Sequence, residues 1–243
     1  MTPFHLVLAI ALLFTAYFVK GFTGFGPALI LIPTFSLLFS PREAVLLTTV
    51  FDLIAGFILL FSVRRLVDWK TVGLVLLAFS PGAYLGARLM TVLPVPIFKK
   101  VLALFVLFFI VLIFWQSTRS KGTYLFGHAP YWLFVFSFFA GLGGGLVGIS
   151  GPLLVIFFKL SFPKPVFRTQ LIAVFAFGAP WRLFLYRSLG LHFSLTTTQW
   201  VLFFLTLLSA ITAGSLVQIR INEQKFNRIV ALILLIPCVT LLL

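Results

Sequence analysis

Gly21-Phe22-Thr23-Gly24-Phe25-Gly26-Pro27 opens the segment that decides the fold, and an apolar run from Ala28 to Phe39 follows it. A related stretch, Gly141-Leu142-Gly143-Gly144-Gly145-Leu146-Val147-Gly148-Ile149-Ser150-Gly151-Pro152, precedes a second apolar run. Glycine at this density predicts an interruption of a regular helix, and a proline directly afterwards suits the first turn of the next helix. We therefore expect two broken helices, one in each half of the chain.

The composition predicts a membrane protein. Of 243 residues, 62% are hydrophobic and only 9% are charged, far from the balance of a soluble domain. At about 20 residues per spanning helix, roughly eight to ten membrane segments would use up the length. Long uninterrupted apolar runs argue against a β-barrel, whose strands alternate. The expected fold class is an all-α polytopic membrane protein in which residues 1–243 form a single transmembrane domain.

The formal net charge of +14 comes from 18 basic and 4 acidic residues. The basic residues are scattered over short loops without a nucleic-acid-binding fold, so we expect no nucleic acid partner. In a membrane protein such charges set orientation and attract anions. The histidines and the single cysteine have no metal-ligand spacing, and we expect neither a metal nor another cofactor. The Walker A, H-E-x-x-H and G-x-S-x-G sequences are all absent, which argues against ATP use and against an enzyme.

The apolar segments form two groups of five: 4–20, 27–39, 42–63, 71–91 and 96–116, then 131–147, 152–160, 166–187, 195–219 and 225–243. The polar loop 117–130 separates a first repeat, 1–116, from a second, 131–243. Three landmarks match between the halves: Gly26-Pro27 with Gly151-Pro152, Gly86 with Gly214, and Phe98-Lys99-Lys100-Val101 with Phe226-Asn227-Arg228-Ile229. The similar offsets of the three matches predict an internal duplication rather than chance similarity.

Basic residues predict the topology. We place the loop with Arg64, Arg65 and Lys70 in the cytoplasm, because basic loops are usually cytoplasmic. With five membrane segments per half, the basic clusters at 159–168 and 220–228 are then cytoplasmic too, whereas four segments per half would place both clusters outside. An odd number per half inverts the second repeat relative to the first. The second segment of each half is short. As a helix, 27–39 reaches about 20 Å against a hydrocarbon core of about 30 Å, which favours a hairpin with its tip inside the membrane over a tilted spanning helix.

Inverted repeats would bring the two hairpin tips together near mid-membrane. Each tip presents a helix start, at Pro27 and at Pro152, where free backbone N–H groups and about half a positive charge collect. Two such helix starts that converge on a dry pocket form an anion site without any charged side chain. The sequence therefore predicts a small anionic substrate.

The stretches 21–33 and 141–152, together with the duplicated organisation, resemble the sulfite exporter TauE/SafE family over essentially the whole chain. The resemblance implies a multi-pass protein of the bacterial cytoplasmic (inner) membrane that moves sulfur oxyanions or organosulfonates. We expect a secondary transporter for a sulfite- or organosulfonate-class anion that works by alternating access. A passive anion channel and a carrier for a non-sulfur organic anion are the alternatives. The particular anion, the direction of transport, the coupling ion and a homo-oligomeric state are left open.

Candidate substrate-binding residues are those at the two breaks and three polar residues of neighbouring segments: Thr23, Gly24, Phe25, Gly26, Pro27, Ser150, Gly151 and Pro152, then Thr48, Thr49 and Gln170. Hydroxyls and backbone N–H groups at the tips would hold oxyanion oxygens. The alternative is that small residues at these positions only pack helices closely together.

Three ionisable residues are candidates for coupling or for the substrate pathway. An aspartate in mid-membrane costs about 2.5–3.5 kcal/mol, so Asp52 should face a partner or a cavity. It is either a proton carrier, with protons as the coupling ion, or one member of a structural pair with Lys20. Arg168 guides the anion from the cytoplasm or anchors its segment. Arg182 lines the external exit or extends towards the membrane surface.

Overall fold

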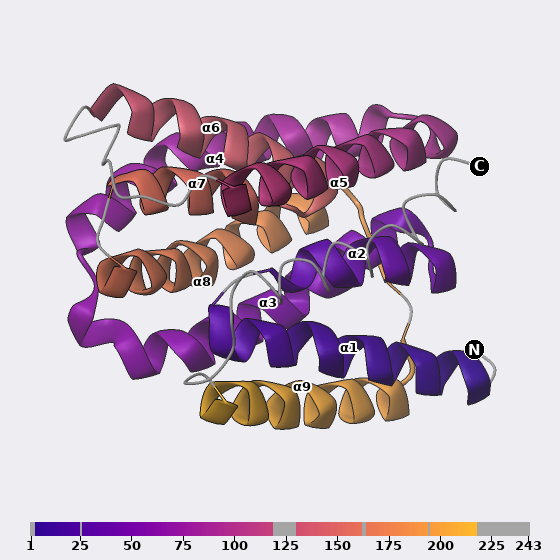
Figure 1. Ribbon diagram of the computed structural model, residues 1–243. Helices are drawn as coiled ribbons and strands as arrows, with labels where there is room; N and C mark the ends of the chain where they lie inside the picture. Colours follow the sequence, from indigo (N-terminus) through magenta and orange to yellow (C-terminus); the bar gives the residue numbers. More distant parts are fainter. Residues whose placement is uncertain (1–2, 25, 119–129, 162–163, 194, 218–243) are drawn as a thin grey trace.

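The computed structural model describes residues 3–24, 26–118, 130–161, 164–193 and 195–217, and over these ranges the regular structure is entirely helical (Figure 1). The helices are α1 (Pro3–Thr23), α2 (Pro27–Leu38), α3 (Pro41–Val63), the short 3-10 helix η1 (Arg64–Leu66), α4 (Trp69–Val92), α5 (Val95–Thr118), α6 (Pro130–Val147), α7 (Gly151–Ser161), α8 (Lys164–Ser188) and α9 (Thr197–Val217). The expected last segment, 225–243, lies outside the described residues.

Four stretches of the described chain are long and apolar enough to cross a membrane: Pro3–Gly21, Pro41–Leu66, Trp69–Val92 and Thr197–Leu216. They confirm the prediction of an all-α polytopic membrane protein. Helices α2 and α7, with 12 and 11 residues, reach only about 18 and 17 Å, less than a hydrocarbon core of about 30 Å. Because every residue of α2 from Pro27 to Ser36 is buried, protein rather than lipid surrounds this short helix.

Local sequence explains where two of the long helices begin. Ser40 precedes α3, and its hydroxyl accepts from the Glu43 N–H while the Glu43 carboxylate accepts from the Ser40 N–H. Pro41 follows at the first helical position, which needs no N–H donor. Asp68 precedes α4, and its carboxylate accepts from the N–H groups of Lys70 and Thr71.

The two short helices belong to hairpins with similar turns. Residues 24–26 join α1 to α2, and residues 148–150 join α6 to α7. Because each short helix packs against the helix before it and only three residues connect them, both pairs run antiparallel. In both turns a glycine with positive φ ends the first helix: Gly24 (φ 84°) donates to the Lys20 carbonyl at 2.8 Å, and Gly148 (φ 76°) donates to the Gly144 carbonyl at 3.1 Å.

The expectation that glycine at this density interrupts a regular helix is wrong for residues 141–147, because α6 continues to Val147, in agreement with the expected apolar segment 131–147. The reason is close packing against α4. A Cβ at Gly141 would overlap the Phe79 carbonyl oxygen, and one at Gly145 would overlap the Ala83 carbonyl oxygen. These glycines allow two helix backbones to touch, as in other membrane bundles. Only the stretch from Gly148 onward forms the turn.

Helices of the two halves pair across the molecule. In Figure 1, α1 lies beside α9 along one edge and α4 lies beside α6 along the other, while α3 packs against α8 between them. The two edge pairs make the same kind of backbone contact. A Cβ at Gly214 of α9 would overlap the Phe18 carbonyl oxygen of α1, and a Cβ at Gly86 of α4 would overlap the Leu142 carbonyl oxygen of α6. The matched glycines Gly86 and Gly214 therefore make equivalent backbone contacts.

Candidate functional site

A small cavity lies between the two turns. Gly26 and Pro27 line it from the first turn, and Ser150, Gly151 and Pro152 line it from the second. Its volume is about 20 Å³, enough for one or two water molecules. The two hairpins thus place the starts of α2 and α7 on one cavity, although these turns lie more than a hundred residues apart in the sequence.

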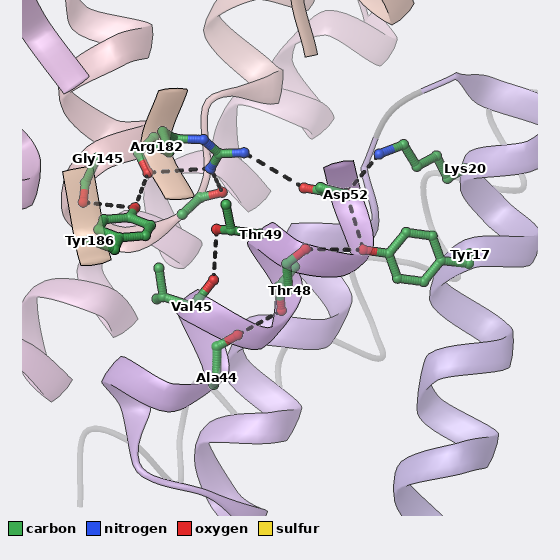
Figure 2. Close-up of polar contacts among 12 residues, drawn as sticks. Tyr17, Lys20, Ala44, Val45, Thr48, Thr49, Asp52, Gly145, Arg182 and Tyr186 are labelled. Atoms are coloured by element: carbon green, nitrogen blue, oxygen red, sulfur yellow. Dashed lines mark hydrogen bonds and ion pairs between the residues drawn. The ribbon is translucent and has the colours of Figure 1, made fainter. Parts of the chain in front are cut away.

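Asp52, the central residue of α3, brings charged side chains from three helices together at this cavity (Figure 2). Its Oδ1 lies 2.6 Å from Lys20 Nζ of α1, and its Oδ2 lies 3.8 Å from Arg182 Nη2 of α8. The Tyr17 hydroxyl lies 3.1 Å from Oδ1 and 3.2 Å from the Thr48 carbonyl oxygen. Lys20, Asp52 and Arg182 are only 2%, 7% and 3% exposed. The shared carboxylate lowers the cost of burying the two cations.

Arg182 also holds the end of α6. Its Nη1 donates to the carbonyl oxygens of Gly144 and Gly148, at 3.3 and 3.0 Å. The Tyr186 hydroxyl lies 2.8 and 2.9 Å from the carbonyl oxygens of Gly144 and Gly145. A cation is favourable at these last-turn carbonyls because of their partial negative charge. Arg182 Nε is buried and makes no hydrogen bond, so the donors of this guanidinium are not all satisfied.

Arg168 binds a backbone carbonyl oxygen near the first turn, as Arg182 does near the second. Its Nη2 donates to the carbonyl oxygen of Gly21, in the last turn of α1, at 3.1 Å. Its side chain also covers Gly24, where an added Cβ would lie 3.2 Å from Arg168 Cγ. One helix, α8, therefore supplies an arginine to each of the two turns.

The cavity carries a formal charge of +1 when its side chains have their ordinary ionisation. Lys20 and Arg182 each contribute +1 and Asp52 contributes −1, and all three line the cavity. The helix dipoles alter this balance little. The positive starts of α2 and α7 lie next to the negative ends of α1 and α6, so their partial charges offset one another to first order. The side chains therefore leave one unit of positive charge in a buried space.

The structure brings together seven of the candidate residues on the cavity lining: Gly26, Pro27, Asp52, Ser150, Gly151, Pro152 and Arg182. The sequence offered two locations for Arg182, and the structure places it at the cavity. The alternative reading of Asp52 as a partner of Lys20 matches the observed ion pair. Asp52 nonetheless lies directly at the cavity, where two cations compensate its charge.

Other candidate residues do not reach the cavity lining. The hydroxyls of Thr23, Thr48 and Thr49 donate to backbone carbonyls one turn earlier in their own helices, at 2.8, 2.7 and 2.8 Å. Gln170 is fully buried, and neither atom of its amide group has a hydrogen-bond partner. Gly24 and Arg168 pack against each other behind the first turn. Phe25 lies outside the described residues.

Sequence reasoning missed part of the site. Lys20 was considered only as a partner of Asp52, and neither Tyr17 nor Tyr186 was considered. A lysine inside an apolar helix, one turn before a glycine break, is the signal that points to Lys20, because ionisable residues within membrane segments generally mark functional sites. The tyrosines carry no comparable signal, since tyrosine is commonly found at the ends of membrane helices, where it lies at the membrane–water interface.

The comparison with known families agrees with this architecture. The profile of the family described as Sulfite exporter TauE/SafE matches residues 8–241, nearly the whole chain. No curated protein and no solved structure matches the chain. The extent of the family match confirms the resemblance seen in the sequence, and the apolar helices agree with it. The chain therefore belongs to the sulfite exporter TauE/SafE family and is a multi-pass membrane protein of a family that transports sulfur-containing anions.

Proposed function

We propose that the chain is a secondary transporter that carries a sulfite- or organosulfonate-class anion across the bacterial cytoplasmic membrane. The anion binds in the cavity between the two turns. The observation that supports this proposal best is the excess positive charge of that cavity, where two buried cations face one buried carboxylate. A buried charge without a counter-ion is unfavourable, so the site is suited to an added negative charge.

The donors at the cavity suit the oxygens of a sulfonate or sulfite group. Lys20 and Arg182 supply charged donors, and the Ser150 hydroxyl supplies a neutral one. Backbone N–H groups in the first turns of α2 and α7 add further donors, although Pro27 and Pro152 contribute none. The cavity holds only about 20 Å³, so the turns must move apart for the anion to enter. A closed, buried site of this kind favours a carrier over a passive channel.

We also propose that residues 1–116 and 131–243 are inverted repeats that rock against each other in alternating access. Three observations support the duplication: the two turns have equal length, each begins at a glycine with positive φ, and Gly86 and Gly214 make equivalent contacts. An inverted arrangement is supported by α2 and α7, which lie towards opposite ends of the bundle in Figure 1. Inverted repeats with broken helices at their interface are typical of secondary transporters.

Proton coupling through Asp52 stays a prediction. The groups that face its carboxylate are Tyr17, Lys20 and Arg182. If Asp52 carries the coupling proton, Asp52→Asn should remove the pH-dependent part of transport. A wild-type pH profile in this variant would rule out that role.

The experiment that tests the proposed function is flux into proteoliposomes that contain the purified chain. Labelled sulfite, sulfate, thiosulfate, sulfoacetate and non-sulfur carboxylates are compared with and without a proton gradient. We expect saturable uptake of a sulfur-containing anion, counterflow driven by the same unlabelled anion, and loss of both in Lys20→Gln. Lys99→Gln is the matched control, because Lys99 is exposed and absent from the cavity lining. Equal uptake in both variants, or channel-like flux without counterflow, would contradict the proposal.

A further inference from the structure

We propose that Asp52 is the resident counter-charge of the anion site and sets the charge of the anion that it accepts. With Asp52 ionised, the site takes up a single negative charge, so it selects a monoanion over a dianion of the same shape. This inference rests on the proposed function, because it concerns the same cavity. It adds the charge class of the substrate and assigns a specificity role to Asp52.

The geometry of the ion cluster is the first argument. The two carboxylate oxygens of Asp52 face different cations, Lys20 Nζ at 2.6 Å and Arg182 Nη2 at 3.8 Å. These cations come from α1 and α8, so Asp52 on α3 lies between helices of the two halves. Tyr17 adds a neutral donor to the Lys20 side of the carboxylate. Asp52 thus neutralises one of the two cations and leaves one positive charge for the substrate.

Within the part of the chain that the structure describes, no other acidic side chain lines the cavity. The protein has four acidic residues. Glu43 and Asp68 serve the starts of α3 and α4, away from the cavity lining, and Glu223 lies outside the described residues. The nearby Arg168 is committed to the carbonyl oxygen of Gly21 and is absent from the lining. The charge of the cavity therefore depends on Lys20, Asp52 and Arg182.

Burial makes this charge balance selective. A monoanion brings the enclosed group of charges to zero, whereas a dianion leaves one negative charge with no partner. Because the three side chains are nearly inaccessible to water, solvent does not screen the unpaired charge, and an unpaired charge in such surroundings is strongly unfavourable. The exchange Asp52→Asn keeps the shape of the side chain but raises the charge of the empty site to +2, which suits a dianion.

Methanesulfonate and sulfate test the inference, because both are tetrahedral and differ by one charge at pH 8. Uptake of each labelled anion is measured in proteoliposomes at equal pH on both sides, so that no proton gradient contributes, and thermal unfolding of each variant checks folding. We expect the wild-type chain to prefer methanesulfonate by about tenfold or more. Asp52→Asn should shift that ratio towards sulfate by at least a similar factor.

The double variant Lys20→Gln/Asp52→Asn is the decisive control. It removes one charge of each sign, so Arg182 alone leaves +1, whereas Lys20→Gln leaves no net charge. The uptake lost in Lys20→Gln should therefore return at a reduced rate in the double variant, with a preference for the monoanion. It also keeps the inference testable if Asp52→Asn alone leaves Lys20 unpaired and fails to fold. A wild-type ratio in Asp52→Asn, a wild-type preference for sulfate, or a double variant that prefers sulfate would overturn the inference while leaving anion transport intact. If the wild-type chain takes up neither these anions nor the sulfur anions of the flux screen, the proposed function itself fails.

Discussion

Gly26 allows the role of the first turn in transport to be separated from backbone strain. It precedes α2 with φ 98°, in the left-handed region, and it lines the cavity. Gly190 has a similar φ of 79°, lies after α8 and is absent from the cavity lining. A Cβ added at either glycine meets no atom within 4 Å. Alanine at either position should therefore impose the same left-handed strain, about 1–2 kcal/mol. For a chain of this size we expect each variant to lower Tm by about 2–8 °C.

Transport should distinguish the two variants. The methyl group of Gly26→Ala enters open space beside a cavity of only about 20 Å³, whereas that of Gly190→Ala enters exposed space far along the chain. We expect Gly26→Ala to transport several-fold more slowly than Gly190→Ala at matched folded amounts, and Gly26→Leu to be inactive although it inserts into the membrane. The assay is saturable anion flux in proteoliposomes, with thermal unfolding in detergent as the measure of folding. Equal flux in the two alanine variants, or wild-type flux in Gly26→Leu, would refute the placement of the substrate at this turn.

Further predictions concern packing, the arginine of α8 and the start of α4. Gly82→Ala should lower the free energy of unfolding by about 1–3 kcal/mol, because its Cβ overlaps the Phe138 carbonyl oxygen. Gly73→Ala on the same helix should be neutral or stabilising, so similar Tm values for the two variants would contradict the close contact at Gly82. Arg182→Lys keeps the charge but loses the guanidinium group, which contacts both Asp52 and the end of α6, so flux and Tm should both fall. Arg88→Lys is the control at an exposed site and should change neither. The hydrogen bond from the Thr71 hydroxyl is the main reason that the pKa of Asp68 lies below its usual value. Its contribution to stability is therefore complete above the unfolded pKa of about 3.9 and is lost as pH falls through the lower folded pKa. The Tm advantage over Asp68→Asn should shrink across that window, and a constant difference from pH 7 to pH 3 would contradict it.

The helical membrane fold and the two hairpins could be predicted because they depend on local composition. Apolar runs of about 20 residues define spanning helices, and short helices after glycine turns follow from glycine and proline preferences. The extent of the second break could not be predicted this way. Gly141 and Gly145 are helical because α4 packs closely against them, and a tertiary contact of this kind is invisible in a single sequence.

The backbone turns of the candidate site could be predicted from the sequence, whereas its side chains could be predicted only in part. Gly26 and the residues 150–152 follow from the turns themselves. The threonines at 48 and 49 looked suitable as mid-segment donors, but in the structure their hydroxyls bond to their own helix. The convergence of Lys20 and Arg182 on one carboxylate depends on how α1, α3 and α8 pack, which helical periodicity alone does not specify.

Helix α8 forms hydrogen bonds with both turns. Arg168 and Arg182 lie fourteen residues apart, or about 21 Å along the helix, and each binds the carbonyl end of a different broken helix. If one turn moves away from α8, one set of charged hydrogen bonds is lost; if both move, two sets are lost. In the proposed cycle, a conformation in which both turns have moved away from α8 would open the cavity to both sides of the membrane. Because both sets of hydrogen bonds are lost in it, this conformation has the highest free energy.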